Sequence, residues 1–291
     1  MILTIVAAAT DGADPQRFFE ALASDGILAC SDVEVWIVQS PSGPVRTAPP
    51  GVNVRSLGAQ ASIFELWGAG VRQAQADAIA ILDVRCPPRQ GWFAAMRAAL
   101  PLSGAVIFGP VVCSMPPDDP NIVGYLTEYV QFNPPLDAAS AEVPGVNFIA
   151  TRSFLSDRRV LQDDGFVKSR LLTLLASSNT PPPQPIPGAV VDYQKPYNFA
   201  EYIVHRFRHG RCFGAQRPLP SPLQWIRAVA STPCLPALRS WRIFRNARRN
   251  PATARAVRRF WLRIGAAETA WSFGEFLGYV AGEGRARRHL R

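Results

Sequence analysis

Short apolar runs alternate with amphipathic segments along the first half of the chain. Leu3–Ala8 is apolar except at Thr4, and the apolar positions of Gln16–Ser24 have helical spacing. Val33–Val38 is rich in β-branched residues and alternates, as strands do. The same reasoning predicts strands over 52–57, 78–82, 104–112, 143–151 and 186–192, and helices over 62–76, 90–100 and 121–131.

This order is typical of an α/β fold, a mostly parallel Rossmann-like sheet with helices on both faces. Ligands of such sheets bind beyond the carboxyl ends of the strands. Asp83 directly follows the apolar strand 78–82, so we expect it at that edge. From Pro196 onward the pattern is helical, with breaks at prolines 218–222, 233–236 and 251, which predicts a C-terminal helical appendage.

The composition is that of a globular protein with a sizeable core. The chain has 291 residues, of which 48% are hydrophobic and 18% charged, and this excludes disorder as its main state. Its five cysteines are scattered without a Cys-x-x-Cys pair, which predicts free thiols in a reducing compartment. No basic N-terminal region precedes the first apolar run, and no uncharged window of about 18 apolar residues follows. We expect a cytoplasmic protein, with peripheral attachment to the inner face of the membrane as the alternative.

Charge is distributed unevenly. Residues 201–291 hold 18 Arg against 4 Glu, a net charge of +14, whereas residues 1–200 hold 13 Lys and Arg against 18 Asp and Glu, a net charge of −5. A cationic C-terminal third indicates an anionic partner: a phosphorylated small molecule, an anionic membrane surface or nucleic acid.

Arginines and large apolar residues alternate between Leu238 and Arg263. On a helix this spacing gives an apolar stripe flanked by guanidinium groups, which is typical of a helix that lies on anionic lipid. The stripe is equally compatible with packing on the body of the protein. Nucleic acid is the least favoured partner, because no recognised binding motif accompanies the charge.

Four stretches in order resemble bacterial family 2 glycosyltransferases, which are inverting enzymes of the GT-A fold. They are the opening strand with ELWGAGVRQAQADAIAILDVRCPPRQGW, then YLTEYVQFNPP with PGVNFIATRSFL, then IPGAVVDYQKPYNFAEYIVHRFRHGRCFGAQRP, and finally GEFLGYVAGEG. The resemblance implies a nucleotide-sugar-binding GT-A domain over residues 1–200 and a basic helical appendage over 201–291. It further implies hexosyl transfer from a nucleotide-diphosphate donor to an acceptor hydroxyl, on a small molecule or on a membrane-associated or lipid-linked glycan. The alternative is a catalytically degenerate relative that acts as a binding or scaffold module.

The resemblance places a metal-binding acidic pair at Asp83-Val84-Arg85, where this chain has a single carboxylate. One carboxylate is a poor ligand set for Mg²⁺ or Mn²⁺. Three interpretations stay open: Arg85 replaces the metal as a bidentate phosphate ligand, Asp83 alone holds a weakly bound metal, or the chain does not catalyse. The nucleoside-binding acid of the family is absent as well, and Gln39 is the candidate in its place.

For the general base, the resemblance indicates Asp163 and Asp164 on a helix before the closing strand, with Arg170 seven residues after Asp163. A second register puts Lys168 at the position of the base, and a helix N-cap or turn is the structural alternative. The resemblance also assigns Arg206 and Arg211 to the diphosphate and four residues to the acceptor side. These four are Glu128, Tyr129, Asn147 and Arg152, and each is equally compatible with core or surface support.

Overall fold

The computed structural model describes residues 1–10, 13–41, 43, 45, 47–58, 61–136, 142–163, 165–166, 168–177, 180–219 and 221–290. The chain separates into two compact units. Met1–Val112 and Phe132–Gln194 form the first, the sheet unit, while Cys113–Gln131 and Lys195–Leu290 form the second, the helical unit. The helical unit thus contains the segment 113–131 besides the chain from Lys195 onward.

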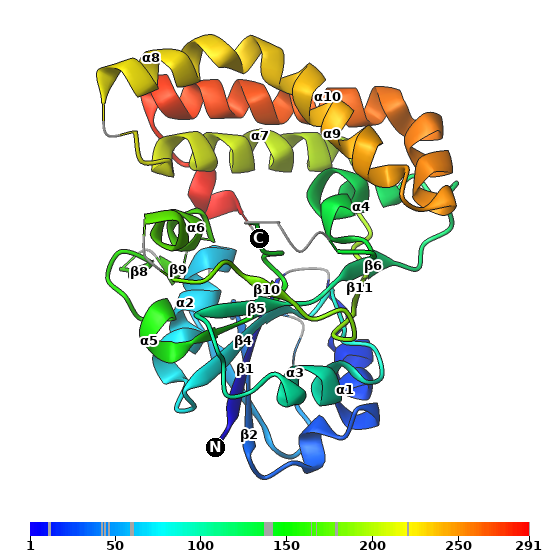
Figure 1. Ribbon diagram of the computed structural model, residues 1–291, viewed down its shortest axis with the longest axis vertical. Helices are drawn as coiled ribbons and strands as arrows, with labels where there is room; N and C mark the ends of the chain where they lie inside the picture. Colours follow the sequence, from blue (N-terminus) through cyan, green and yellow to red (C-terminus); the bar gives the residue numbers. More distant parts are fainter. Residues whose placement is uncertain are drawn as a thin grey trace. The chain divides into compact units, whose positions relative to one another are not determined.

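The sheet unit is built on one seven-stranded sheet with the strand order β10-β5-β7-β4-β1-β2-β3 (Figure 1). Only β7 runs antiparallel to its neighbours, so the predicted mostly parallel sheet is confirmed. In chain order the strands are β1 (Leu3–Ala9), β2 (Val33–Gln39), β3 (Val52–Ser56), β4 (Ala78–Asp83), β5 (Val106–Phe108), β7 (Asn147–Thr151) and β10 (Gln184–Pro185).

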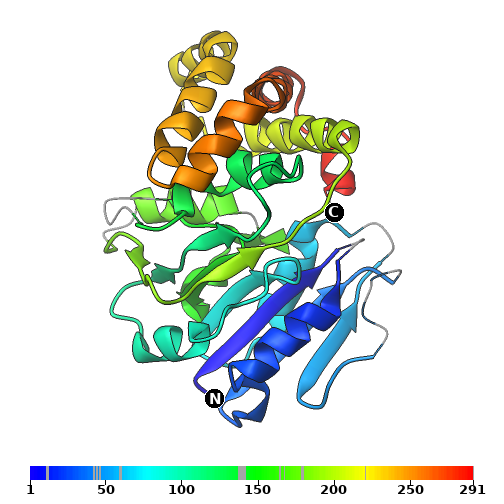
Figure 2. The same cartoon turned by 90° about the vertical axis from the view of Figure 1, so that its right-hand side faces the viewer.

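The two central strands are buried along their whole length, which explains their continuous apolar sequences. Helices α1 (Pro15–Ser24) and α3 (Trp92–Ala98) lie on one face of the sheet, and α2 (Ile63–Gln73) lies on the other (Figures 1 and 2). The Asp25 carboxylate at the end of α1 accepts hydrogen bonds from the first backbone amides of α3. On the other face, the Trp67 indole of α2 donates to the backbone carbonyl of Leu82 in β4.

The order in which successive strands are added to the sheet reverses at β1. It passes from β1 outward to β2 and β3, and then returns to β4 on the other side of β1. Such a switch point opens a crevice at the carboxyl ends of the two strands. Ala8 of β1 is paired with Asp83, the last residue of β4, so the sheet itself places Asp83 at this crevice.

Smaller elements complete the sheet unit. The strand expected over 104–112 is broken into β5 and β6 (Val111–Cys113), with Gly109 and Pro110 between them. A Cβ on Gly109 would overlap the Ala189 carbonyl, so only glycine fits there. Strand β6 pairs with β11 (Val191–Tyr193). The other elements are the 3-10 helix over Ile27–Ala29, helices α5 (Arg152–Leu155) and α6 (Lys168–Ser177), and the hairpin of β8 (Leu161–Gln162) and β9 (Gly165–Phe166). A 3-10 helix over Val130–Phe132 spans the boundary between the two units.

The helical unit has the predicted series of helices with breaks near the prolines, and at these breaks prolines begin the next helix. Pro222 and Pro251 stand in the first turns of two helices, after the N-caps Ser221 and Asn250. Its elements are α4 (Ile122–Glu128), α7 (Phe199–Gln216), α8 (Pro222–Ser231), α9 (Leu235–Ala247) and α10 (Pro251–Ala281), with short 3-10 helices at Thr232–Cys234 and Ala286–His289.

Helices α7 and α10 pack with their backbones almost in contact. A Cβ on Gly210 or Gly214 of α7 would overlap a backbone carbonyl of α10, and one on Gly274 or Gly278 of α10 would overlap a carbonyl of α7. Each helix thus carries two glycines four residues apart on the contact face. Among the residues that the structure describes, no helix is both long and apolar enough to cross a bilayer.

Candidate functional site

Asp83 lies at the carboxyl end of β4 and is almost completely buried. Its Oδ1 accepts hydrogen bonds from the backbone amide and the Nε of Arg85, both at 2.9 Å. Its Oδ2 accepts from Nη2 of the same guanidinium at 2.5 Å. The acid at the predicted position therefore forms a bidentate ion pair with the arginine two residues later in the chain.

The pair is strong because both partners are removed from water: the side chains of Arg85 and Asp83 are 9% and 4% exposed. Burial alone lowers the pKa of Arg85, but the charge of Asp83 and its hydrogen bonds more than offset this, so the pKa lies above its ordinary value. Arg85 stays charged under all ordinary conditions. The guanidinium has five N–H groups, and Asp83 takes two of them.

The same geometry recurs at Asp157 and Arg159. There too, the carboxylate accepts from the backbone amide, the Nε and the Nη2 of the arginine two residues later. This second pair lies at the surface. In this protein an Asp-x-Arg sequence can thus form a local ion pair between its own two charged side chains. The pair of Asp83 and Arg85 differs from the other one by its burial at the switch point.

Asp83 does not suit a divalent cation as it stands. Both carboxylate oxygens receive donors from Arg85, and the positive guanidinium occupies the place where a hard cation would bind. Within the described part of the chain, no group of three His, Cys, Asp or Glu side chains is placed to hold a metal. The donor set therefore does not fit Mg²⁺ or Mn²⁺.

Next to Asp83, the end of β1 presents a buried hydroxyl. Thr10 is 3% exposed, and its Oγ1 has no hydrogen-bond partner among the described residues. A buried hydroxyl without a partner is costly unless a ligand or water satisfies it. Its position two residues after Ala8, the neighbour of Asp83, puts this hydroxyl at the same crevice.

The side-chain amide of Gln39, at the end of β2, forms hydrogen bonds within the protein. Its side-chain Nε2 donates to the carbonyl of Val45 at 2.8 Å, and its Oε1 accepts from the amide of Val45 at 2.9 Å. Both ends of the amide thus fasten the loop after β2. This geometry argues against the predicted contact with a nucleoside base or ribose.

Asp192 in β11 is a buried acid near Asp83 that the sequence analysis does not single out. The chain after Asp83 runs beside β11, since Gln194 donates to the Arg85 carbonyl and Asp192 to the Pro87 carbonyl through their backbone amides. The buried Asp192 carboxylate lies 3.3 Å from Nη2 of Arg89, which is half exposed. The available signal was a single acid within the apolar run before Tyr193.

Of the predicted acceptor-side residues, Asn147 lies at the carboxyl edge, paired with Leu82 of β4, whereas Arg152 lies at the opposite edge. Asn147 is completely buried, donates to the carbonyls of Pro110 and Ala189, and accepts from the Trp92 indole, so it holds neighbouring segments together. Arg152 follows Thr151, which pairs with Ala78 at the amino end of β4, the opposite end from Asp83. The occupied side-chain amide of Asn147 and the position of Arg152 argue against the predicted contacts with sugar or acceptor.

Asp163, which the sequence predicts on a helix, lies instead at a hairpin turn. Asp163 is exposed directly after β8, and Asp164 falls outside the described residues. Gly165, which begins β9, packs against Phe64 in the first turn of α2. Because α2 follows the carboxyl end of β3, its first turn lies at the carboxyl edge of the sheet. The role of Asp163 as a base stays a prediction.

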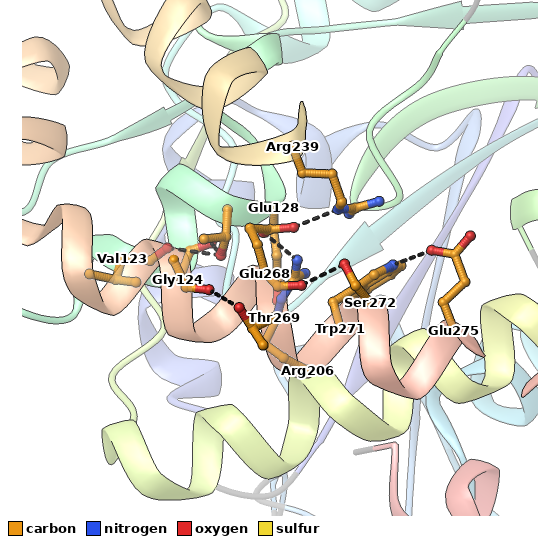
Figure 3. Close-up of polar contacts among 12 residues, drawn as sticks. Val123, Gly124, Glu128, Arg206, Arg239, Glu268, Thr269, Trp271, Ser272 and Glu275 are labelled. Atoms are coloured by element: carbon orange, nitrogen blue, oxygen red, sulfur yellow. Dashed lines mark hydrogen bonds and ion pairs between the residues drawn. The ribbon is translucent and has the colours of Figure 1, made fainter. Parts of the chain in front are cut away.

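In the helical unit, Arg206 is buried and forms an ion pair with Glu268 at 2.6 Å (Figure 3). Arg239 approaches the other oxygen of Glu268 at 2.5 Å, and both guanidinium groups lie over the Trp271 ring. Arg206 thus neutralises a fully buried carboxylate. A diphosphate would have to displace Glu268, which argues against the predicted role of Arg206.

The remaining predicted residues also have partners within the helical unit. Arg211 is half-buried, and its Nε donates to the carbonyl of Gly282 at 2.8 Å. Glu128 accepts a hydrogen bond from the hydroxyl of Tyr202 at 3.1 Å. The backbone amide of Tyr129 continues α4 by donating to Tyr125. The ligand-binding roles proposed for Arg211, Glu128 and Tyr129 stay predictions.

A shallow pocket of about 630 Å³ lies elsewhere on the sheet unit. It is lined by the end of α2, Asp77 and residues 151–156, so it opens at the amino end of β4. Ligands of parallel sheets bind at the opposite edge. We therefore place the candidate site at Asp83, Arg85 and Thr10 and not at this pocket.

Comparison with solved structures decides the fold. The mannosyltransferase PcManGT from Pyrobaculum calidifontis, solved in complex with GDP-Man and Mn²⁺, superposes with a TM-score of 0.53 over 96% of this chain and 87% of its own, at 14% sequence identity. This chain has a GT-A type fold. The GT-A architecture expected from the sequence, with its C-terminal helices, is thereby confirmed.

Other structures with this likeness are more distant. S. aureus TarS 1-349 in complex with UDP-GlcNAc has a TM-score of 0.48 at 11% identity, covering 90% of this chain and 92% of its own. Glucosyl-3-phosphoglycerate synthase from Mycobacterium tuberculosis has a TM-score of 0.47 at 11% identity, covering 69% and 74%. Neither protein-family models nor curated proteins match the sequence.

Proposed function

We propose that this GT-A type chain binds a nucleotide-diphosphate sugar at the switch point between β1 and β4 and transfers the sugar to an acceptor hydroxyl with inversion. The observation that carries the proposal is the buried Asp83–Arg85 pair at this crevice, beside the unpartnered Thr10 hydroxyl. The fold shared with a mannosyltransferase that binds GDP-Man supports a nucleotide sugar as the ligand.

The chemistry requires positive charge beside the departing diphosphate. Arg85 supplies a permanent charge, and three of its N–H groups are left after Asp83 has taken two. Guanidinium groups match phosphate oxygens in geometry as well as in charge. Asp83 holds the guanidinium in place, so the pair is a rigid donor for phosphate oxygens, and no metal is assigned to it.

In the transfer step, the acceptor oxygen forms a bond to the anomeric carbon while the bond from that carbon to the diphosphate oxygen breaks. The acceptor proton moves to a carboxylate, and the electron pair of the broken bond leaves with the diphosphate. We assign the proton to Asp163, because its carboxylate is exposed at a hairpin turn whose Gly165 packs on the first turn of α2. A direct displacement of this kind inverts the anomeric configuration.

The test is turnover of nucleotide sugars by the purified chain, with GDP-mannose as the first donor. We expect release of nucleoside diphosphate that persists with a chelator present, and a product of inverted configuration by NMR. A strict requirement for Mg²⁺ or Mn²⁺ would contradict the role of Arg85. Asp163→Asn should abolish transfer and leave donor affinity unchanged, whereas unchanged transfer would remove Asp163 as the base.

The occupied Asp83 carboxylate also favours a second function, a binding or scaffold module that retains the donor site and lacks catalysis. The two functions differ in a single comparison. Calorimetric binding of a nucleotide sugar without any turnover, over a panel of acceptor alcohols and glycans, supports the module. Binding together with turnover supports the enzyme.

A further inference from the structure

Helix α8 is exposed on nearly all sides. Within this helix only Ala228 is buried, while Leu223 and Ile226 are 55% and 54% exposed. The Trp225 indole donates to the backbone carbonyl of Tyr279, which fixes α8 against α10. With this anchor in place, two large aliphatic side chains three residues apart are held out in water, where they are costly.

Helix α9 presents a similar surface. Its buried residues are Ile243 and Ala247, whereas Leu238 and Trp241 are 41% and 54% exposed. Arg242 and Arg245, one turn further along the same face, are exposed as well. The guanidinium of Arg245 lies 4.9 Å from the centre of the Trp241 ring. We call Leu223, Ile226, Arg227, Leu238, Trp241, Arg242 and Arg245 the α8–α9 surface.

The charge around this surface has one sign. Residues 222–250 contain six Arg and no Asp or Glu. The two acids of the neighbouring α10, Glu268 and Glu275, are buried and paired inside the unit, as Figure 3 shows for Glu268. Exposed apolar side chains therefore stand among guanidinium groups, in a segment that contains no acidic residue.

We propose that the α8–α9 surface docks on an anionic phospholipid bilayer. Guanidinium groups pair with lipid phosphates, and Trp, Leu and Ile enter the boundary between headgroups and acyl chains. Helices α8 and α9 follow one another along the chain, and both pack on α10 (Figures 1 and 2). The inference does not depend on the proposed catalytic function.

A bilayer explains both halves of this surface. A nucleic acid would complement the arginines, but it gives the exposed Leu223 and Ile226 no apolar environment. Lipid supplies the phosphate and the apolar layer together. Binding should accordingly need anionic headgroups and the apolar side chains at the same time.

The experiment is flotation of the full chain with phosphatidylcholine vesicles and with mixed phosphatidylcholine and phosphatidylglycerol vesicles. We expect partitioning only to the anionic vesicles, weakened by salt. Arg242→Gln with Arg245→Gln should lower partitioning about 25-fold, since each arginine near the surface contributes about fivefold. Leu223→Gln with Ile226→Gln should lower it by roughly tenfold or more.

The matched control is Val204→Gln on α7, an exposed apolar residue away from this surface, which should leave partitioning unchanged. All of these side chains are exposed, and circular dichroism of each variant establishes that the fold is kept. Equal partitioning of wild type and both double variants would overturn the proposal. A second result would also overturn it. If heparin displaces the protein from the vesicles, and the arginine variants lose vesicle binding while the aliphatic variants keep it, the surface is a site for polyanions and not for a bilayer.

Discussion

At the scale of single residues, the candidate site depends on how Arg85 is held. Asp83 fixes it through three hydrogen bonds, and burial strengthens each of them by excluding water. Arg85 in turn neutralises the charge of a buried carboxylate. The pair of Asp157 and Arg159 has the same hydrogen bonds at the surface, so it serves as a control for the effect of burial.

We expect Arg85→Ala to lower the free energy of unfolding by about 3 to 5 kcal/mol, because it leaves a buried charge without its partner. Arg159→Ala should cause no measurable change. Urea denaturation of both variants is the measurement. Arg85→Lys, which retains the charge, should fold and bind GDP roughly tenfold or more weakly, because lysine cannot form the bidentate contact. Equal stability of the two alanine variants would refute the structural importance of Arg85.

Cysteine reactivity reports on burial in the helical unit. Burial raises the pKa of Cys212 to about 12, with a smaller contribution from the charge of Glu283. At pH 8 the Cys212 thiol is therefore protonated and unreactive, whereas Cys234 is exposed. Alkylation by iodoacetamide, followed by peptide mass spectrometry, should label Cys234 and spare Cys212. In urea both should react, and equal labelling of the native protein would contradict the burial of Cys212.

At the scale of elements, close approach of α7 and α10 organises the helical unit. The contact leaves no room for side chains at Gly210, Gly214, Gly274 and Gly278. The ion pair of Arg206 with Glu268 lies in the same interface and ties α7 to α10. Glycine normally weakens a helix, so its presence here is explained by packing.

We expect Gly274→Ala to destabilise the protein by about 1 to 3 kcal/mol, because the added methyl group overlaps the Phe207 carbonyl. Gly265→Ala on the same helix has open space around it and should stabilise by about 0.5 to 1 kcal/mol. Thermal unfolding of the two variants measures both effects. A stabilising Gly274→Ala would show that the helices do not pack this closely.

The sequence predicted elements best where one physical signal dominated. Strands β1 and β4 are continuous apolar runs, and prolines with polar caps mark where α8 and α10 begin. The hairpin at 161–166 was missed because strands of two residues have no periodicity. Segment 113–131 belongs with the helices through long-range packing, such as the bond between the Thr127 and Tyr202 hydroxyls, which local patterns do not encode.

The site shows the same limit. Strand order and the position of Asp83 follow from the alternation of elements, so the carboxyl edge could be predicted. Side-chain orientation and burial determine the ion pair of Asp83 with Arg85. They also determine the hydrogen bonds that Gln39 and Asn147 form with the protein's own backbone. Residue identity alone does not determine these.

At the scale of the whole molecule, two chemically different units are joined in one chain. The sheet unit provides a crevice at the switch point, and the helical unit provides a basic surface with exposed apolar side chains. Each has its own proposed partner, a nucleotide sugar for the first and an anionic bilayer for the second. The two proposals can therefore fail separately.

The central claim, a nucleotide-sugar site at the ends of β1 and β4, is tested most directly by hydrogen exchange with and without GDP-mannose. We predict slower exchange of backbone amides at Thr10 and around Asp83 to Arg85, and unchanged exchange at the pocket formed by Arg72 and residues 151–156. Slower exchange confined to that pocket at the amino edge would contradict the proposed site. So would the absence of any slowed amide with every nucleotide sugar tested.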